Sequence, residues 1–255
     1  MNLTRATLIA TVLAAGLCFA GTNETSPATL TSKTAETLFE DGIEASRLGD
    51  YTDAAGAFGE SLRLSPSSGA LLNLGVTQWR RGRAGDAVLA WEQALWLDPF
   101  NADARNNLDF ARNVAQIEPP RLAWHEAVST RLPSGLWAWM AVASLCVVLF
   151  MITLPPVFRW RKTGWHQALA ALGLGVFLLS IPANIGVISR ARTGFVLEKN
   201  TPLFLTPTED AESTTTLAAG EPARLVRMRG EFVLIRTQYG RGWVAAKRFG
   251  LICPQ

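Results

Sequence analysis

The sequence has few of the residues from which catalytic and metal sites are most often built. Its 255 residues include two histidines, His125 and His166, and three cysteines, Cys18, Cys146 and Cys253. The cysteines lie far apart in sequence, and no cysteine and histidine have the spacing of a metal site. A long apolar run separates the two histidines, and no Ser-His-Asp set or glycine-rich phosphate loop occurs. We therefore expect no enzymatic activity, no cofactor and no metal.

Charge is also scarce, since only 18% of the residues are charged and the formal net charge is +3. So small a net charge excludes a general electrostatic affinity for nucleic acid. The distribution is uneven: residues 21–135 carry 10 basic and 15 acidic side chains, whereas residues 190–255 carry 10 basic and 6 acidic ones. An acidic first half and a basic last segment are therefore predicted.

The first twenty residues have the pattern of a secretory signal peptide. Arg5 provides the positive start, Ala6 to Phe19 is uncharged, and Ala20 precedes a small residue at Gly21. We expect residues 1–20 to direct the rest of the chain across the membrane, whether this segment is cleaved or kept as an anchor.

Two apolar runs in the middle of the chain predict a pair of transmembrane helices. Leu136 to Leu154 is free of charge, and at 1.5 Å per residue it spans about 28 Å, close to the ~30 Å of a hydrocarbon core. Ala168 to Ile188 is a second run of this kind. We place the helices at residues 136–158 and 167–189.

The loop between the two helices, residues 159–166, contains Arg159, Arg161 and Lys162. The positive-inside rule places such a loop in the cytoplasm. Both large segments of the chain should then lie on the outer side of a bacterial inner membrane, in the periplasm. Ala171 and Gly175 form a pair of small residues four apart, which fits either packing within the hairpin or contact with a partner's helix.

The segment before the membrane contains an internal repeat. Five pairs of residues recur 33 positions apart: Gly49/Gly82, Ala54/Ala87, Phe58/Trp91, Leu62/Leu95 and Pro66/Pro99. The pattern is a helix, a tight turn, a second helix with a large aromatic, and a proline that ends it. It resembles the tetratricopeptide repeat over residues 35–66 and 68–99, with a capping helix at 101–117, so that residues 34–117 form one α-helical solenoid.

Stacked repeats of this family present a groove lined by the first helix of each pair. The register places eight residues in it: Phe39, Ile43, Asn73, Val76, Trp79, Arg80, Asn107 and Phe110. The resemblance implies that Asn73 and Asn107 hold the backbone of a bound peptide, since a primary amide both donates and accepts hydrogen bonds. Alternatively, Asn73 bonds only within its own helix pair.

After the second apolar run the helical period is lost, and short β-rich runs alternate with Gly, Pro and Thr. Five strands in about sixty residues predict a small all-β barrel. Gly242-Trp243-Val244 resembles the ending of bacterial SH3 domains, so we assign residues 194–255 to an SH3-like domain. Tyr239 and Trp243 are its candidate contact surface, although Trp243 fits the barrel core as well.

The whole order of parts defines a multidomain membrane protein. It resembles the BatE-type proteins of the Bacteroides aerotolerance operon, most closely in Asn73 to Gly75 and Asp98 to Leu108. The resemblance implies partners that are membrane proteins with von Willebrand A domains and a MoxR-type AAA+ ATPase, in an assembly that serves envelope stress tolerance.

Three functional hypotheses follow. The first is an adaptor that binds partner proteins through its repeats and its SH3-like domain. The second is a tether that binds murein through the SH3-like domain. In the third, the acidic repeats and the basic barrel dock on each other and mask the groove, a contact that would weaken above ~0.15 M salt.

Overall fold

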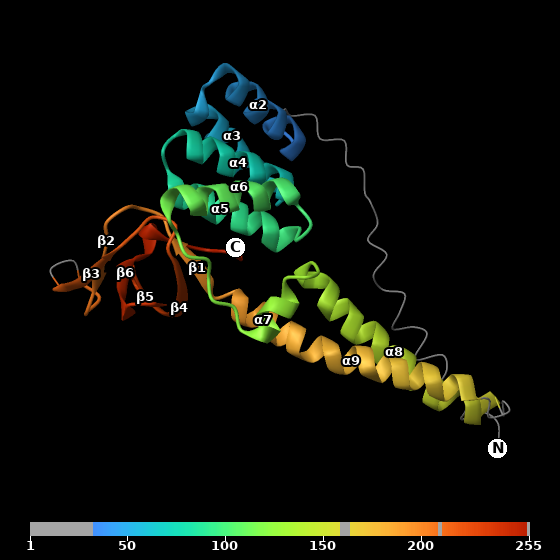
Figure 1. Cartoon of the computed structure of the whole chain (residues 1–255). Coiled ribbons are helices and arrows are strands. Elements are labelled where there is room, and N and C mark those ends of the chain that lie inside the picture. The colour runs from blue at the N-terminus through green and yellow to red at the C-terminus, as the bar shows by residue number, and fades with distance from the viewer. Residues whose placement is uncertain (1–32, 159–163, 209–210, 254–255) are drawn as a thin grey trace. The chain divides into compact units, whose positions relative to one another are not determined.

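The computed structural model describes residues 33–158, 164–208 and 211–253. The predicted signal peptide and most of the predicted cytoplasmic loop lie outside these ranges. All of the described elements belong to one compact unit, residues 33–255. It consists of a set of short helices, two long apolar helices and an antiparallel sheet (Figure 1).

Five helices of similar length follow one another at the start of the described chain, and each packs on the next (Figure 1). They are α2 (Ala35–Leu48), α3 (Tyr51–Leu64), α4 (Ser68–Arg80), α5 (Ala84–Leu97) and α6 (Ala102–Ala115). Their bounds agree with the two helix pairs and the additional helix that the repeat pattern predicts.

The ends of these helices explain several of the recurring residues. Four of the five have a polar N-cap side chain that accepts a hydrogen bond from the backbone three residues on: Thr34, Asp50, Ser67 and Asn101. Gly49 and Gly82 have φ values of 84° and 75° in the two tight turns, a conformation that glycine adopts without steric cost. The turn glycines are therefore fixed by backbone geometry.

The large aromatic of each pair is buried against a glycine of the helix before it. Phe58 is 1% exposed and Trp91 is 2% exposed. A Cβ atom at Gly42 would overlap the ring of Phe58, and one at Gly75 would overlap the indole of Trp91. The two helix pairs therefore use the same glycine-to-aromatic contact, so the sequence repeat is also a packing repeat.

The two long helices are α8 (Ser134–Phe158) and α9 (Gly164–Arg190), which lie side by side (Figure 1). Both are long and apolar enough to cross a membrane. Many of their large apolar side chains are exposed, including Trp139, Leu172 and Ile188. Most of the surface of this hairpin is thus not covered by other described parts of the chain.

The hairpin packs through a different small residue from the expected pair. Gly173 is buried, and a Cβ atom there would meet Val148 of α8. Ala171 and Gly175 are exposed, and nothing lies within 4 Å of a Cβ built on Gly175. The interpretation that Ala171 and Gly175 pack within the hairpin is therefore wrong, because the helix turns their side toward the outside.

The last part of the chain forms a seven-stranded antiparallel sheet in the order β3-β2-β6-β5-β4-β1-β7. The strands are β1 (Thr193–Val196), β2 (Thr201–Phe204), β3 (Ser213–Leu217), β4 (Pro222–Arg229), β5 (Phe232–Thr237), β6 (Gly240–Ala245) and β7 (Phe249–Leu251), with a 3-10 turn at Ala246–Arg248 between the last two. The prediction of five strands was too low. It missed β3, whose four polar residues lack apolar alternation, and the three-residue β7.

Residues from most of these strands form the core of the sheet, with Leu203, Val233, Ile235 and Val244 among its most buried members. Trp243 neighbours Val244 on β6 and therefore points to the opposite face, where it is half-buried and its Cα is paired with that of Leu234. The core position on this strand is Val244, and the interpretation of Trp243 as a core residue is wrong.

The sheet also packs on the helix pairs, chiefly on α5. Phe195 of β1 and Ile252, which follows β7, belong to the same buried cluster as Val88 and Trp91. Gln93 Nε2 donates to the backbone oxygen of Leu251 at 2.8 Å. No ion pair joins the helix pairs to the sheet within the described residues, so this contact rests on apolar packing and not on the opposite charges of the two segments.

We predict that Gly75→Ala lowers the stability of the protein by about 1–3 kcal/mol, because its Cβ would overpack the Trp91 indole. The matched control is Gly56→Ala in α3, where nothing lies within 4 Å of the added Cβ. This control should be stabilising by about 0.5–1 kcal/mol, since alanine favours a helix interior. Thermal unfolding followed by circular dichroism measures both changes, and equal shifts of the two variants would contradict the packing described.

Candidate functional site

The first helices of the repeats form a continuous surface, because α2 contacts α4 and α4 contacts α6. On it, the rings of Trp79 and Phe110 meet edge to face with their centroids 5.9 Å apart. Trp79 is in turn held by Trp91, at 6.1 Å between ring centroids. Phe110 nevertheless remains 56% exposed. A rigidly supported aromatic pair therefore faces outward from α4 and α6.

The other predicted groove residues lie on the same three helices with different degrees of burial. Phe39, Ile43, Asn73, Val76 and Asn107 are half-buried, and Arg80 is exposed. The Phe39 ring packs on Phe58 at 5.7 Å between centroids, so it supports the first helix pair. Among the ring contacts of the described chain, only the Trp79–Phe110 pair joins two predicted groove residues.

The structure does not support the alternative in which the Asn73 side chain forms hydrogen bonds within its own helix pair. Thr77 Oγ1 donates to the backbone oxygen of Asn73 at 2.8 Å, but the Asn73 side-chain amide bonds no other described residue. The side-chain amide of Asn107 is likewise not bonded within the described chain. Both amides thus keep their donors and acceptors for a ligand, on the two helices that carry the aromatic pair.

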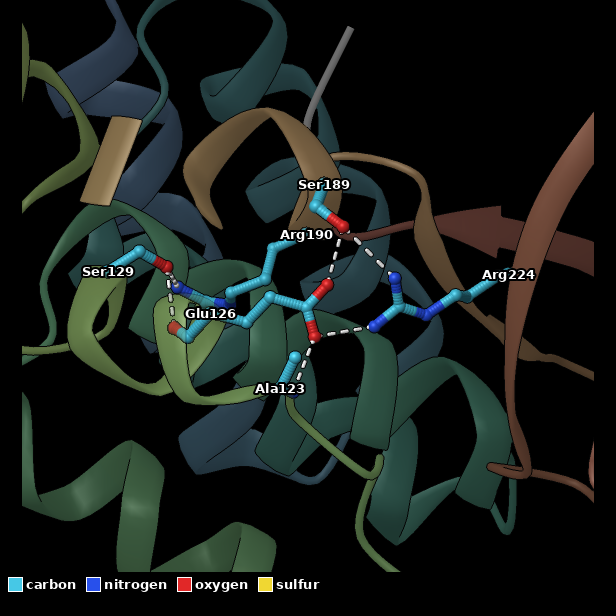
Figure 2. A network of polar contacts seen from close by, with 6 residues as sticks. All are labelled: Ala123, Glu126, Ser129, Ser189, Arg190 and Arg224. Atoms are coloured by element: carbon cyan, nitrogen blue, oxygen red, sulfur yellow. Dashed lines mark hydrogen bonds and ion pairs between the residues drawn. The ribbon is translucent and has the colours of Figure 1, made fainter. Parts of the chain in front are cut away.

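A second polar site lies where the short helix α7 (Trp124–Ser129) meets α9 and β4. The Glu126 side chain is 1% exposed and accepts three hydrogen bonds (Figure 2). Arg224 Nη2 donates to it at 2.6 Å, Ser189 Oγ at 2.5 Å, and the Ala123 backbone N–H at 2.9 Å. One carboxylate therefore joins α7, the end of α9 and strand β4.

Two further contacts connect this carboxylate to its surroundings. Arg224 Nη1 donates to Ser189 Oγ at 3.0 Å, so Arg224 bonds two of the three elements. Ser129 Oγ donates to the Glu126 backbone oxygen at 2.6 Å and lies 3.4 Å from Arg190 Nη1 (Figure 2). Close approach of α7 to α9 is possible because a Cβ at Gly186 would overlap the backbone of His125.

The electrostatics of Glu126 follow from these contacts. Burial acts to raise the pKa of its carboxyl group, but the hydrogen bonds from Arg224, Ser189 and the Ala123 backbone outweigh burial and lower the pKa to about 2. The group is therefore ionised at neutral pH and stabilises the folded state in that form.

The candidate residues of the sheet lie apart from both sites. Tyr239 is 60% exposed in the turn between β5 and β6, and Trp243 is half-buried on β6. No ring contact joins the two within the described part of the chain. Nor do three or more His, Cys, Asp or Glu side chains gather as a metal site among the residues that were described.

Comparison with known proteins adds no identification. No protein-family model matches this chain, and no match is found among the curated proteins. The predicted groove residues and the Glu126 site therefore have to be interpreted from their own chemistry.

Sequence reasoning missed the Glu126 site entirely. Glu126 and Arg224 are 98 residues apart, and no local pattern marks either of them. The sequence offered only a weak signal for this site. Glu126 precedes the first apolar run, and Ser189 and Arg190 come at the end of the second. Only the fold shows that these positions meet.

We predict that Glu126→Gln lowers stability at pH 7 by about 1–3 kcal/mol, because it leaves the Arg224 guanidinium without its carboxylate. The wild-type contribution should be complete above pH ~4.5 and decline as the pH falls toward 2, since the folded pKa lies below the ordinary value of 4.5. Thermal unfolding between pH 2 and 7 should show this dependence and its loss in the variant.

Glu118→Gln is the matched control, because Glu118 pairs with Arg121 at 3.9 Å between two highly exposed side chains. Its effect should stay within about 0.5 kcal/mol. Equal effects of the two substitutions would contradict the buried role of Glu126.

Proposed function

We propose that this protein is a non-enzymatic adaptor anchored in a bacterial inner membrane, with tetratricopeptide repeats and an SH3-like domain that bind partner proteins in the periplasm. The observation that carries the proposal is the Trp79–Phe110 pair, in which Phe110 is exposed, on the same two helices as the unbonded amides of Asn73 and Asn107.

The long helices support a membrane anchor. Large apolar side chains such as Leu149, Leu178 and Ile185 are exposed along α8 and α9, which is unfavourable in water and favourable in lipid. Glu126 precedes this hairpin and Arg224 follows it, yet they are in contact at 2.6 Å. This contact across the hairpin supports an arrangement in which the repeats and the sheet lie on the same side of the membrane.

The surface of α4 and α6 supports binding of an extended peptide. Aromatic rings provide most of the apolar contact area in protein recognition at a low cost in side-chain entropy, and Trp79 is already fixed between Trp91 and Phe110. The Asn73 and Asn107 amides on these helices can donate hydrogen bonds to, and accept them from, the backbone of an extended peptide that has no partner strand. A short groove of this kind suits a short segment of the partner.

The proposed partners come from the resemblance to BatE-type proteins. They are membrane proteins with von Willebrand A domains and a MoxR-type AAA+ ATPase assembly. An anchored adaptor would hold such partners close together at the membrane, which raises their effective concentration without any chemistry of its own.

We predict that the combined change Asn73→Ala, Trp79→Ala and Asn107→Ala reduces partner capture at least tenfold, because it removes both the amides and the aromatic support. Crosslinking in the native membrane, followed by mass spectrometry, measures the links from residues 35–115 to integral membrane proteins.

A matched control replaces three exposed residues outside the predicted groove: Phe100, which is 66% exposed, together with Asn106 and Asn113. Capture by this control should equal that of the wild type. Undiminished capture by the groove variant would refute the groove, whereas links confined to wall material would favour the murein tether.

A second prediction concerns topology. In a background without the native cysteines, Ser65→Cys in the repeats and Gln238→Cys in the sheet should both react with a membrane-impermeant maleimide added outside spheroplasts, because both side chains are exposed and their modules share one side. Reaction of only one of the two would contradict the hairpin, and reaction of neither before lysis would reverse the proposed orientation.

A further inference from the structure

A cavity of about 310 Å³ adjoins α6. The residues of α6 match those of α4 at a step of 34, so Arg105 and Asp109 occupy the positions of Leu71 and Gly75. On α4, Gly75 is the residue against which the Trp91 indole of the next helix packs. Arg105 and Asp109 both line the cavity, which therefore lies where a further repeat would place its second helix.

The lining combines apolar and charged side chains. Leu95, Leu108, Phe195 and Ile252 contribute apolar surface, while three guanidinium groups and two carboxylates contribute charge. Both carboxylates are near one arginine, since Glu92 is hydrogen-bonded to Arg112 and Asp109 lies 3.9 Å from it. The lining therefore carries one more guanidinium group than carboxylates, and neither Arg105 nor Arg190 has a carboxylate within 4.0 Å among the described residues.

Arg190 is the most unusual of these residues. Its side chain is buried at 9% exposure, yet no carboxylate oxygen of the described residues lies within 4.0 Å of its guanidinium nitrogens. Its contacts are Ser129 Oγ at 3.4 Å and the Trp96 ring, whose centroid is 5.2 Å from Cζ. The charges of Glu92 and Glu126 act on Arg190 from beyond 4.0 Å, so neither carboxylate takes its hydrogen-bond donors, and these remain for an anion.

Arg190 also ends α9, so in a membrane it would lie at the depth of the lipid phosphates. The cavity volume suits a small polar group with apolar neighbours on one side. Guanidinium groups bind phosphate oxygens through two parallel hydrogen bonds. Arg105 and Arg190 both line the cavity, and Arg105 uses Nη2 for a hydrogen bond to the Pro99 backbone oxygen, which leaves its other donors.

We propose that this cavity binds a phosphate group between Arg190 and Arg105, supplied by a phospholipid headgroup or by free phosphate. If the phosphate belongs to a phospholipid, the proposal depends on the membrane anchor of the proposed function. Binding of free phosphate does not depend on it. The site would connect the end of α9 to the repeats through a ligand, beside the Glu126 contacts.

The test uses the full-length protein, delipidated in a neutral detergent. Native mass spectrometry measures retention of dioleoylphosphatidylglycerol, with dioleoylglycerol as the probe that has the same chains and no phosphate. Phosphorus NMR line broadening measures binding of inorganic phosphate. The variants are Arg190→Gln and Arg105→Gln, and the control is Arg192→Gln, which removes one positive charge at an exposed position two residues away.

Retention of the phosphatidylglycerol alone, weakened roughly tenfold or more by Arg190→Gln and Arg105→Gln but not by Arg192→Gln, supports a lipid phosphate. Binding of inorganic phosphate with the same dependence, without lipid retention, supports the site with a soluble source. Equal retention of the two lipids without phosphate binding, or equal loss in all three variants, overturns the proposal. Since Arg105 is exposed, its variant keeps the test valid even if Arg190→Gln fails to fold.

Discussion

Burial of the Glu126 carboxylate constrains the rest of the structure. An ionised carboxylate removed from water needs hydrogen-bond donors on both oxygens, and those of Glu126 come from the Ala123 backbone, Ser189 and Arg224. A helix of six residues such as α7 does not form by itself in water, so its order depends on these contacts. The short helix, the end of α9 and strand β4 therefore take their positions together.

The helix pairs are organised by a different constraint, the fit of an aromatic ring against a glycine. This fit buries Trp91, and Trp91 in turn supports Trp79 beneath the exposed Phe110. The sheet packs on α5 through Phe195, and Phe110 remains 56% exposed. The contact between the sheet and the helix pairs thus leaves Phe110 of the predicted groove uncovered, contrary to the docking hypothesis.

The sequence predicts those features that repeat or that extend over many residues. The 33-residue period gives the helix bounds, because the turn glycines and the N-caps are local requirements. The two apolar runs give α8 and α9. Strand β3 was missed because the polar Ser213 to Thr216 pair with β2 at an edge, where no apolar face is needed. The Glu126 site was missed because its contacts join residues up to 98 positions apart, and the half-buried state of Trp243 depends on strand register.

The most direct test of the account is hydrogen exchange in α7, measured by mass spectrometry on the full-length protein and on Arg224→Gln. The account predicts slow exchange of the backbone amides of residues 127–129 in the wild type, and much faster exchange when Arg224, 98 positions further on, loses its charge. Unchanged protection of α7 in the variant would show that Glu126 does not hold these three elements together.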